Sequence, residues 1–131
     1  MIESMAHIGI AVRDLQSAIC LYENLLGRRV HSLVKIPDEG HDIAFFQLDT
    51  ISIELISPTK SDSTVARFLE KRGEGIHHIA LRTDDIKKEL ERVENLGMKL
   101  VNKEPKVGSH NTKTAFLHPK DLRGVLVELV Q

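Results

Sequence analysis

The sequence has one cysteine, no tryptophan and few aromatic residues, which narrows the folds and sites that it can form. Cys20 alone excludes an internal disulfide and a zinc site made only of cysteines. Aromatic residues make up 4% of the chain, so we expect an aliphatic core. No apolar run approaches the roughly 20 residues of a membrane-spanning helix, and the start of the sequence lacks the pattern of a secretory signal. These absences predict a cytoplasmic protein.

Neither sign of charge dominates the chain. It has 18 Lys and Arg residues against 19 Asp and Glu residues, for a formal net charge of -1. This balance gives no electrostatic reason to bind nucleic acid or an anionic membrane. With 131 residues, 41% hydrophobic and 28% charged, the composition is typical of one globular domain.

The sequence contains one pattern twice. Residues 7–15 (HIGIAVRDL) resemble residues 78–86 (HIALRTDDI), 71 positions later (78 − 7). After each copy, an Asp precedes a helical pattern that a Gly ends, over residues 15–26 and 86–96. A third helix is expected over residues 64–71. The short β-like runs that follow the two long helices cover residues 30–35, 43–47 and 51–56, and then 99–102, 113–118 and 125–130.

The repeat predicts an α+β fold in which two βαβββ modules form a partly open, eight-stranded, barrel-like sheet. We expect a single domain over residues 1–131, with modules at about 1–60 and 74–131 and a helical linker at about 61–73. The apolar stripes of the two long helices predict their buried residues. These are Leu15, Ile19, Tyr22 and Leu26, and then Ile86, Leu90, Val93 and Leu96. Cys20 is expected in the core, and His41 at the surface.

Each half places a histidine on its first strand and a glutamate on its last strand. His7 and His78 share a strand face with small residues, which leaves room for a ligand. Glu54 and Glu128 lie within otherwise apolar strands, where an uncompensated charge is costly. A lone histidine is usually structural, and a lone strand glutamate can face water. Because the pattern recurs, we favour one divalent cation shared by all four residues, of the kind that imidazole and carboxylate bind together.

Several stretches of the chain resemble a known family. They are residues 7–12, 63–80, 115–120 and 124–129. The first is typical of the vicinal oxygen chelate (VOC) superfamily, which includes glyoxalase I and the extradiol dioxygenases. The others resemble the methylmalonyl-CoA epimerases within it. The resemblance implies the VOC fold, an acyl-CoA thioester substrate and a homodimer. It also implies a metal held by His7, Glu54, His78 and Glu128, with Co²⁺ first and Zn²⁺, Mn²⁺ or Ni²⁺ as alternatives.

The same resemblance indicates which residues could act as the acid and the base in the proton transfer that epimerases catalyse. Glu128 matches one of the two acid/base residues of epimerases. At least one member of the family carries its second acid/base residue at the position that is Ile43 in this sequence, and Asp42 is adjacent to it. We therefore expect Glu54 to take the second role, with Asp42 as the alternative.

The implied activity is epimerisation of methylmalonyl-CoA at its 2-carbon, by removal and return of a proton. The rivals are a lactoylglutathione lyase like glyoxalase I, an extradiol dioxygenase, and a binding protein of this fold without catalysis. His110, Lys120 and Arg123 are candidate contacts for the CoA portion, although solvated loop charges would look the same.

Overall fold

The computed structural model describes residues 1–131, which fold into eight strands, three α-helices and two short 3₁₀ helices. The strands are β1 (Ile2–Ala11), β2 (Ser32–Ile36), β3 (His41–Gln47), β4 (Ser52–Pro58), β5 (Gly75–Thr83), β6 (Lys106–Val107), β7 (Lys113–Leu117) and β8 (Val127–Val130). The helices are α1 (Leu15–Leu26), α2 (Thr64–Arg72), α3 (Ile86–Asn95), η1 (Ser109–Asn111) and η2 (Pro119–Leu122). None of them is long and apolar enough to span a membrane.

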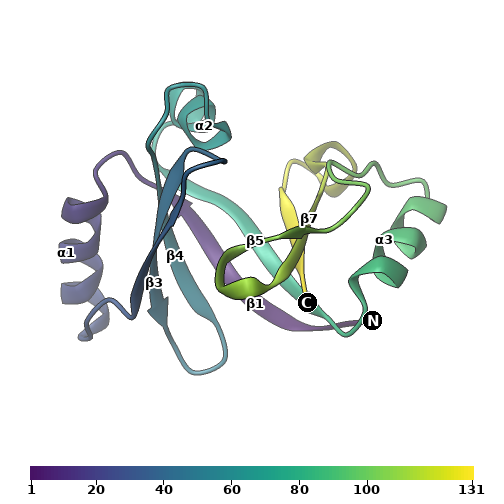
Figure 1. Ribbon diagram of the computed structural model, residues 1–131, viewed down its shortest axis with the longest axis horizontal. Helices are drawn as coiled ribbons and strands as arrows, with labels where there is room; N and C mark the ends of the chain where they lie inside the picture. Colours follow the sequence, from purple (N-terminus) through teal and green to yellow (C-terminus); the bar gives the residue numbers. More distant parts are fainter. The chain divides into compact units, whose positions relative to one another are not determined.

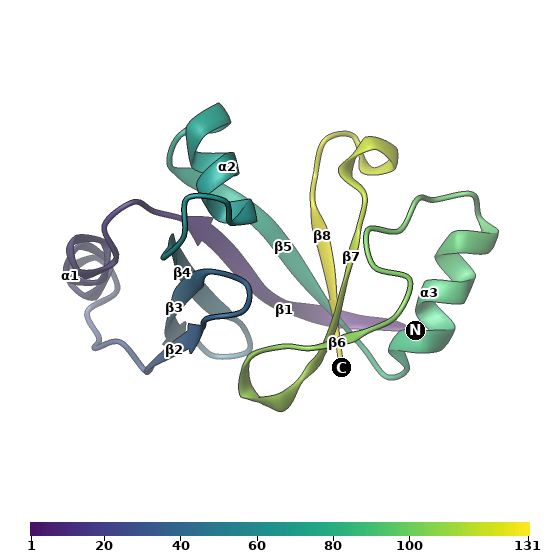
Figure 2. The same cartoon turned by 45° about the horizontal axis from the view of Figure 1, so that its top comes forward.

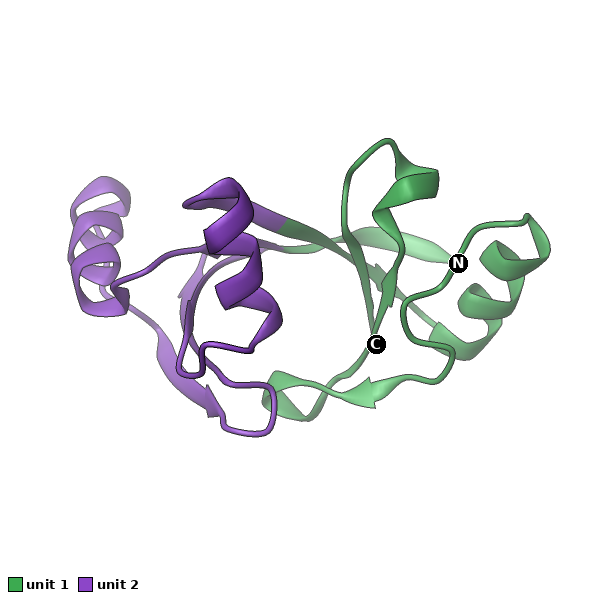
Figure 3. Cartoon of the chain, turned by 90° about the horizontal axis from the view of Figure 1, so that it is seen from above, with its two compact units in different colours: residues 1–7, 78–131 green, residues 8–77 purple.

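The chain divides into two compact units. One contains residues Ile8–His77, and the other combines Met1–His7 with His78–Gln131 (Figure 3). The division falls inside β1, so the two histidines of the repeat, His7 and His78, belong to the same unit.

In the unit of residues 8–77, the strands follow the order β2-β3-β4-β1, and β3 is antiparallel to both β2 and β4. Helix α1 lies beside β3 and β4 (Figure 1), where Ile19 packs with Phe46 and Leu55. Helix α2 contributes Val65 and Leu69 to a second cluster that contains residues of β3 and β4. The residues of β3 and β4 therefore alternate between packing with α1 and packing with α2.

In the other unit, the strands follow the order β5-β8-β7-β6. Strands β5 and β8 are parallel, and β7 is antiparallel to β8. Helix α3 lies beside these strands (Figure 2) and packs Leu90 and Val93 against Leu117 and Leu129. The core of this unit therefore lies between α3 and the face of the sheet that carries Leu117 and Leu129.

The three α-helices begin where the sequence predicts, and each ends within one residue of the predicted end. The side chain of Asp14 accepts a hydrogen bond from the amide of Ser17 at the start of α1, and Asp85 does the same for Lys88 at the start of α3. Gly27 follows α1 with a φ of 64°, the left-handed conformation that glycine adopts without a Cβ clash.

The predicted fold is confirmed, because β1-α1-β2-β3-β4 is repeated, after α2, as β5-α3-β6-β7-β8. One strand prediction is wrong. Residues 99–102 form no strand, and Leu100 makes only an isolated bridge to Leu117. The amides of Val101 and Asn102 both donate to the carbonyl of Phe116, so no regular ladder continues there.

Three burial predictions are also wrong. Leu96 is 63% exposed, because it caps the end of α3 instead of continuing its buried face. Cys20 is exposed, on the side of α1 away from the core. His41 is buried, since it begins β3 directly opposite Pro58 of β4.

Candidate metal centre

Three of the four predicted ligands come together within one compact unit. His7 comes from β1, His78 from β5 and Glu128 from β8. The parallel register of β5 and β8 sets Glu128 beside Ala80, two residues from His78. The three residues are only 8%, 4% and 7% exposed, respectively. The sheet thus gathers two imidazoles and a carboxylate in a site largely shielded from water.

The three side chains converge on one point. The Nε2 atoms of His7 and His78 are 2.9 Å apart, and Oε2 of Glu128 lies 2.9 Å from the first and 3.0 Å from the second. A metal bonded at about 2.1 Å to two ligands at a right angle keeps those ligands about 3.0 Å apart. A single proton can be shared between the Nε2 atoms of two facing imidazoles. A metal cation can instead accept a lone pair from each imidazole and from the carboxylate at the same time. The cluster is therefore a suitable donor set for a divalent metal ion.

Glu128 is held in its charged form. Burial alone would raise its pKa, but hydrogen bonds from His7 and His78, together with their charges, lower the pKa from 4.5 to about 2. At neutral pH the side chain is therefore a carboxylate, which is the form that binds a metal or accepts a proton.

The residues packed around the cluster are apolar. Ala80 is fully buried, and it packs with Ala6 and Val130. The ring of Phe116, on β7, meets the ring of His78 edge-on, with centroids 5.4 Å apart and an interplanar angle of 84°. Phe116 lies directly opposite Glu128 in the β7–β8 register. The sequence does not single out Phe116, because its place beside the site depends on the pairing of β7 with β8.

Glu54 lies in the other unit, in the middle of β4, where it is buried. Its direct partner in the register is Phe45 of β3, and Ile56 pairs with Ile43. Glu54 therefore shares its face of the sheet with Phe45 and Ile43. Asp42 has the opposite parity on β3 and points to the other face. Of the two candidates for the second acid/base position, only Glu54 lies on that face.

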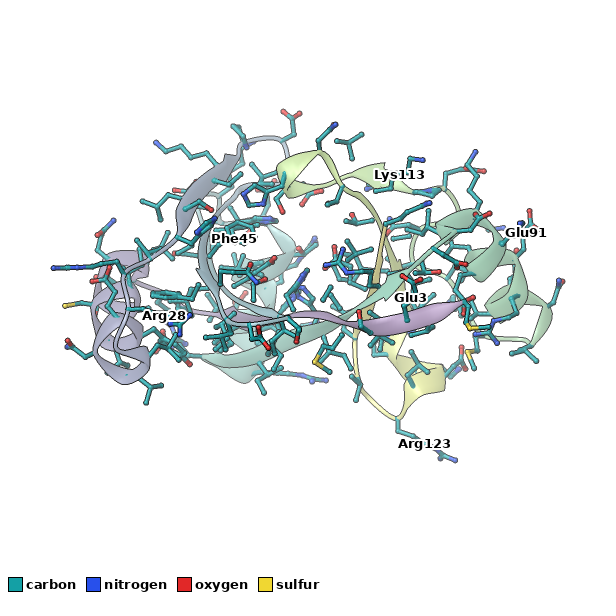
Figure 4. All side chains as sticks on the ribbon, turned by 90° about the horizontal axis from the view of Figure 1, so that it is seen from below. Glu3, Arg28, Phe45, Glu91, Lys113 and Arg123 are labelled. Carbon is teal, nitrogen blue, oxygen red and sulfur yellow. The ribbon has the colours of Figure 1, made fainter.

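The candidate contacts for the CoA portion lie on loops. His110, in η1, is exposed, with a φ of 55°. Lys120, in η2, is exposed, and Arg123, which follows η2, extends away from the ribbon (Figure 4). These exposed positions could meet a ligand, and they suit solvated surface residues equally well.

Comparisons with known proteins agree with this architecture. Ethylmalonyl-CoA/methylmalonyl-CoA epimerase of Cereibacter sphaeroides is 41% identical over an alignment of 133 positions, which covers 100% of this chain and 99% of that protein. Human mitochondrial methylmalonyl-CoA epimerase is 39% identical over 126 residues, which cover 95% of this chain and 72% of that protein. The solved structure of a Streptomyces coelicolor methylmalonyl-CoA epimerase variant, in complex with 2-nitronate-propionyl-CoA, is also similar. It has a TM-score of 0.96 at 34% identity and covers 99% of this chain and 94% of that one.

Residues 6–116 match the Glyoxalase/Bleomycin resistance protein/Dioxygenase superfamily. This span includes both copies of the repeated motif, residues 7–15 and 78–86, and the order of the strands and helices along the chain is that of two βαβββ modules. The chain belongs to this superfamily.

Proposed function

We propose that this protein is an epimerase that inverts the 2-carbon of methylmalonyl-CoA. The observation that carries the proposal is the likeness, along at least 95% of the chain, to relatives named as epimerases of this substrate or of its ethyl homologue. The buried cluster of His7, His78 and Glu128 supplies chemistry that such a reaction requires.

The metal ligands that we propose are His7, His78, Glu128 and Glu54. Contacts among the first three support this set, and Glu54 is included because it is the repeat equivalent of Glu128 and is buried. The ion is divalent, and Co²⁺ is the first candidate by family resemblance. When bound, it would supply Lewis-acid stabilisation of the negative charge that builds up on the thioester oxygen.

The residues of the chain would move the proton. The 2-carbon lies between a thioester and a carboxylate, so its proton is acidic enough for a carboxylate base to remove. Glu128 is ionised at neutral pH and can accept that proton. A second carboxyl group must return a proton to the opposite face of the planar carbon. The shielded site would slow exchange of the intermediate with bulk water.

We propose Glu54 as that second group. Its burial in β4 supports the role, as does its place on the same face as Ile43, the position that matches the family's second acid/base residue. Asp42 is the weaker candidate because its parity on β3 directs it to the other face.

By the same resemblance, we propose that the protein is a homodimer and that His110, Lys120 and Arg123 contact the CoA portion of the substrate. The exposed loop positions of these three residues support this assignment. Light scattering coupled to size-exclusion chromatography would test the dimer. Alanine variants of the loop residues would test the contacts, because loss of a binding contact raises KM and leaves kcat unchanged.

The activity is tested by incubating the protein with methylmalonyl-CoA in deuterated water, with and without a chelator. We expect uptake of deuterium at the 2-carbon, measured by mass spectrometry, well above the background without enzyme. The chelator should abolish this uptake, and added Co²⁺ should restore it.

Two results would overturn the proposal. Deuterium uptake that persists in the chelator would contradict the metal-dependent mechanism. Faster turnover of a glutathione hemithioacetal than of methylmalonyl-CoA would assign the protein to the lyases instead.

A further inference from the structure

Each of the two glutamates has a phenylalanine as its direct neighbour across an antiparallel strand pair. Phe116 of β7 is opposite Glu128 of β8, and Phe45 of β3 is opposite Glu54 of β4. Directly opposite side chains point to the same face, with Cβ atoms about 5 Å apart. The duplication therefore extends beyond the histidines and glutamates to an aromatic ring beside each carboxylate.

Phe116 also contacts a second member of the cluster. The ring of His78 meets the ring of Phe116 edge-on, with centroids 5.4 Å apart, and meets the ring of His7 in the same way at 5.1 Å. Edge-to-face contacts of this kind are directional, because the positive ring edge points at the negative ring face. The orientation of the imidazole of His78 is thus constrained by two rings.

The backbone fixes the place of Phe116. Its amide donates a hydrogen bond of 2.9 Å to Oδ1 of Asn102, and its carbonyl accepts from the amides of Val101 and Asn102. These bonds hold β7 beside the residues that precede β6. The ring consequently projects from an anchored strand position and not from a free loop.

The packing core of this unit lies on the other face of β7. Ala115 and Leu117, the neighbours of Phe116 in the chain, pack with Val127, Leu129 and helix α3. Phe116 has the opposite parity and is half-buried. A large aromatic side chain at this position is therefore not explained by the α3 core.

We propose that Phe116 is a positioning residue, which holds the imidazole of His78 in the orientation that binds the metal and covers one side of the Glu128 carboxylate. This inference rests on the proposed metal site. Groups that orient a metal ligand without touching the metal contribute about 10- to 100-fold to metal affinity. Phe116 supplies such an effect through ring contact.

The experiment measures Co²⁺ binding to metal-free protein by calorimetry and by the visible absorption of the bound ion, without any substrate. The variants are Phe116→Leu, which keeps an apolar side chain but removes the ring, and Phe116→Tyr, which keeps the ring. The matched control is Phe46→Leu. Phe46 is fully buried in the α1 core, so the control makes the same change in another unit.

We expect Phe116→Leu to bind Co²⁺ about 10- to 100-fold more weakly than the wild type and to alter the absorption spectrum of the ion. Phe116→Tyr should keep the wild-type Co²⁺ affinity and the wild-type absorption spectrum. Phe46→Leu should lower thermal stability while its Co²⁺ affinity stays at the wild-type value. In turnover assays with saturating Co²⁺, Phe116→Leu should lower kcat and leave KM unchanged.

Wild-type affinity and spectrum in Phe116→Leu would overturn the inference, and so would an equal loss of affinity in Phe46→Leu. Failure of the wild type to bind Co²⁺ would overturn it together with the metal site. If the wild type binds Co²⁺ but does not epimerise methylmalonyl-CoA, the proposed function fails. In that case, the Co²⁺ affinities of the Phe116 variants still test the role of Phe116.

Discussion

Replacing Glu128 with glutamine should remove a defined part of the pH dependence of stability. In the folded protein, the hydrogen bonds from His7 and His78 outweigh the effect of burial, and they hold the pKa of Glu128 at about 2, against an ordinary value of 4.5. A group whose folded pKa is depressed stabilises the fold above its unfolded pKa. That stabilisation is lost as pH falls toward the folded pKa. The relevant window therefore runs from about pH 4.5 down to about pH 2.

The magnitude follows from the two pKa values. The gap between 4.5 and about 2, at about 1.4 kcal/mol for each pKa unit, gives about 3 kcal/mol in favour of the folded protein at pH 5. Little of this is screened by solvent, since Glu128 is only 7% exposed. By pH 3, about 2 kcal/mol of this contribution should be gone.

The assay is urea denaturation of the metal-free wild type and of Glu128→Gln at several pH values between 3 and 7. The difference in free energy of unfolding should shrink by about 2 kcal/mol between pH 5 and pH 3. Glu89→Gln serves as a positive comparison, because the hydrogen bond from Arg92 in α3 also lowers the pKa of Glu89, and its difference from the wild type should therefore also shrink toward low pH. A constant difference between wild type and Glu128→Gln across the whole range would refute the reasoning.

Three other changes have definite expected outcomes. Glu54→Gln should lower kcat by about 100- to 10,000-fold at saturating Co²⁺, as loss of an acid/base residue does, measured by the interconversion of the two epimers at the 2-carbon. Glu89→Gln should lower the free energy of unfolding by about 1–3 kcal/mol at pH 7, because the buried carboxylate accepts a hydrogen bond from Arg92. This loss should shrink below pH 4.5, since that bond lowers the pKa of Glu89. Arg123→Gly should raise the free energy of unfolding by about 1 kcal/mol in urea denaturation, because Arg123 adopts a φ of 57° that favours glycine.

Local patterns in the sequence predict much of the fold. The helix bounds follow from caps and apolar stripes, because both signals lie within the helix or next to it. Glu89 shows the limit of such patterns. It is 2% exposed although its charge predicts a surface position, and its burial depends on Arg92 one turn further along α3. Leu96 shows the converse, since the apolar stripe continues past the residue where α3 ends.

The histidines and glutamates of the site could be selected from the sequence because the repeat marks them twice. Phe116 and Phe45 could not be selected, since nothing in a single strand shows which residue of the next strand lies opposite. That information is in the register, which depends on loop length and tertiary packing. The apolar residues next to a buried carboxylate can therefore be identified only from the structure.

The division of the chain within β1 makes the two halves of the repeat chemically unequal. Each half of the sequence contributes one histidine, yet residues 1–7 fold with residues 78–131, so both imidazoles lie in the unit of Glu128. Their hydrogen bonds lower the pKa of Glu128, whereas Glu54 lies in the other unit, opposite Phe45. Epimerisation requires one carboxyl group that takes a proton and another that gives one, and unlike surroundings separate such roles in paired carboxyl groups. Under the proposed mechanism, the repeat supplies two equivalent glutamates, and the placement of the first strand gives them the unlike surroundings that an acid and a base require.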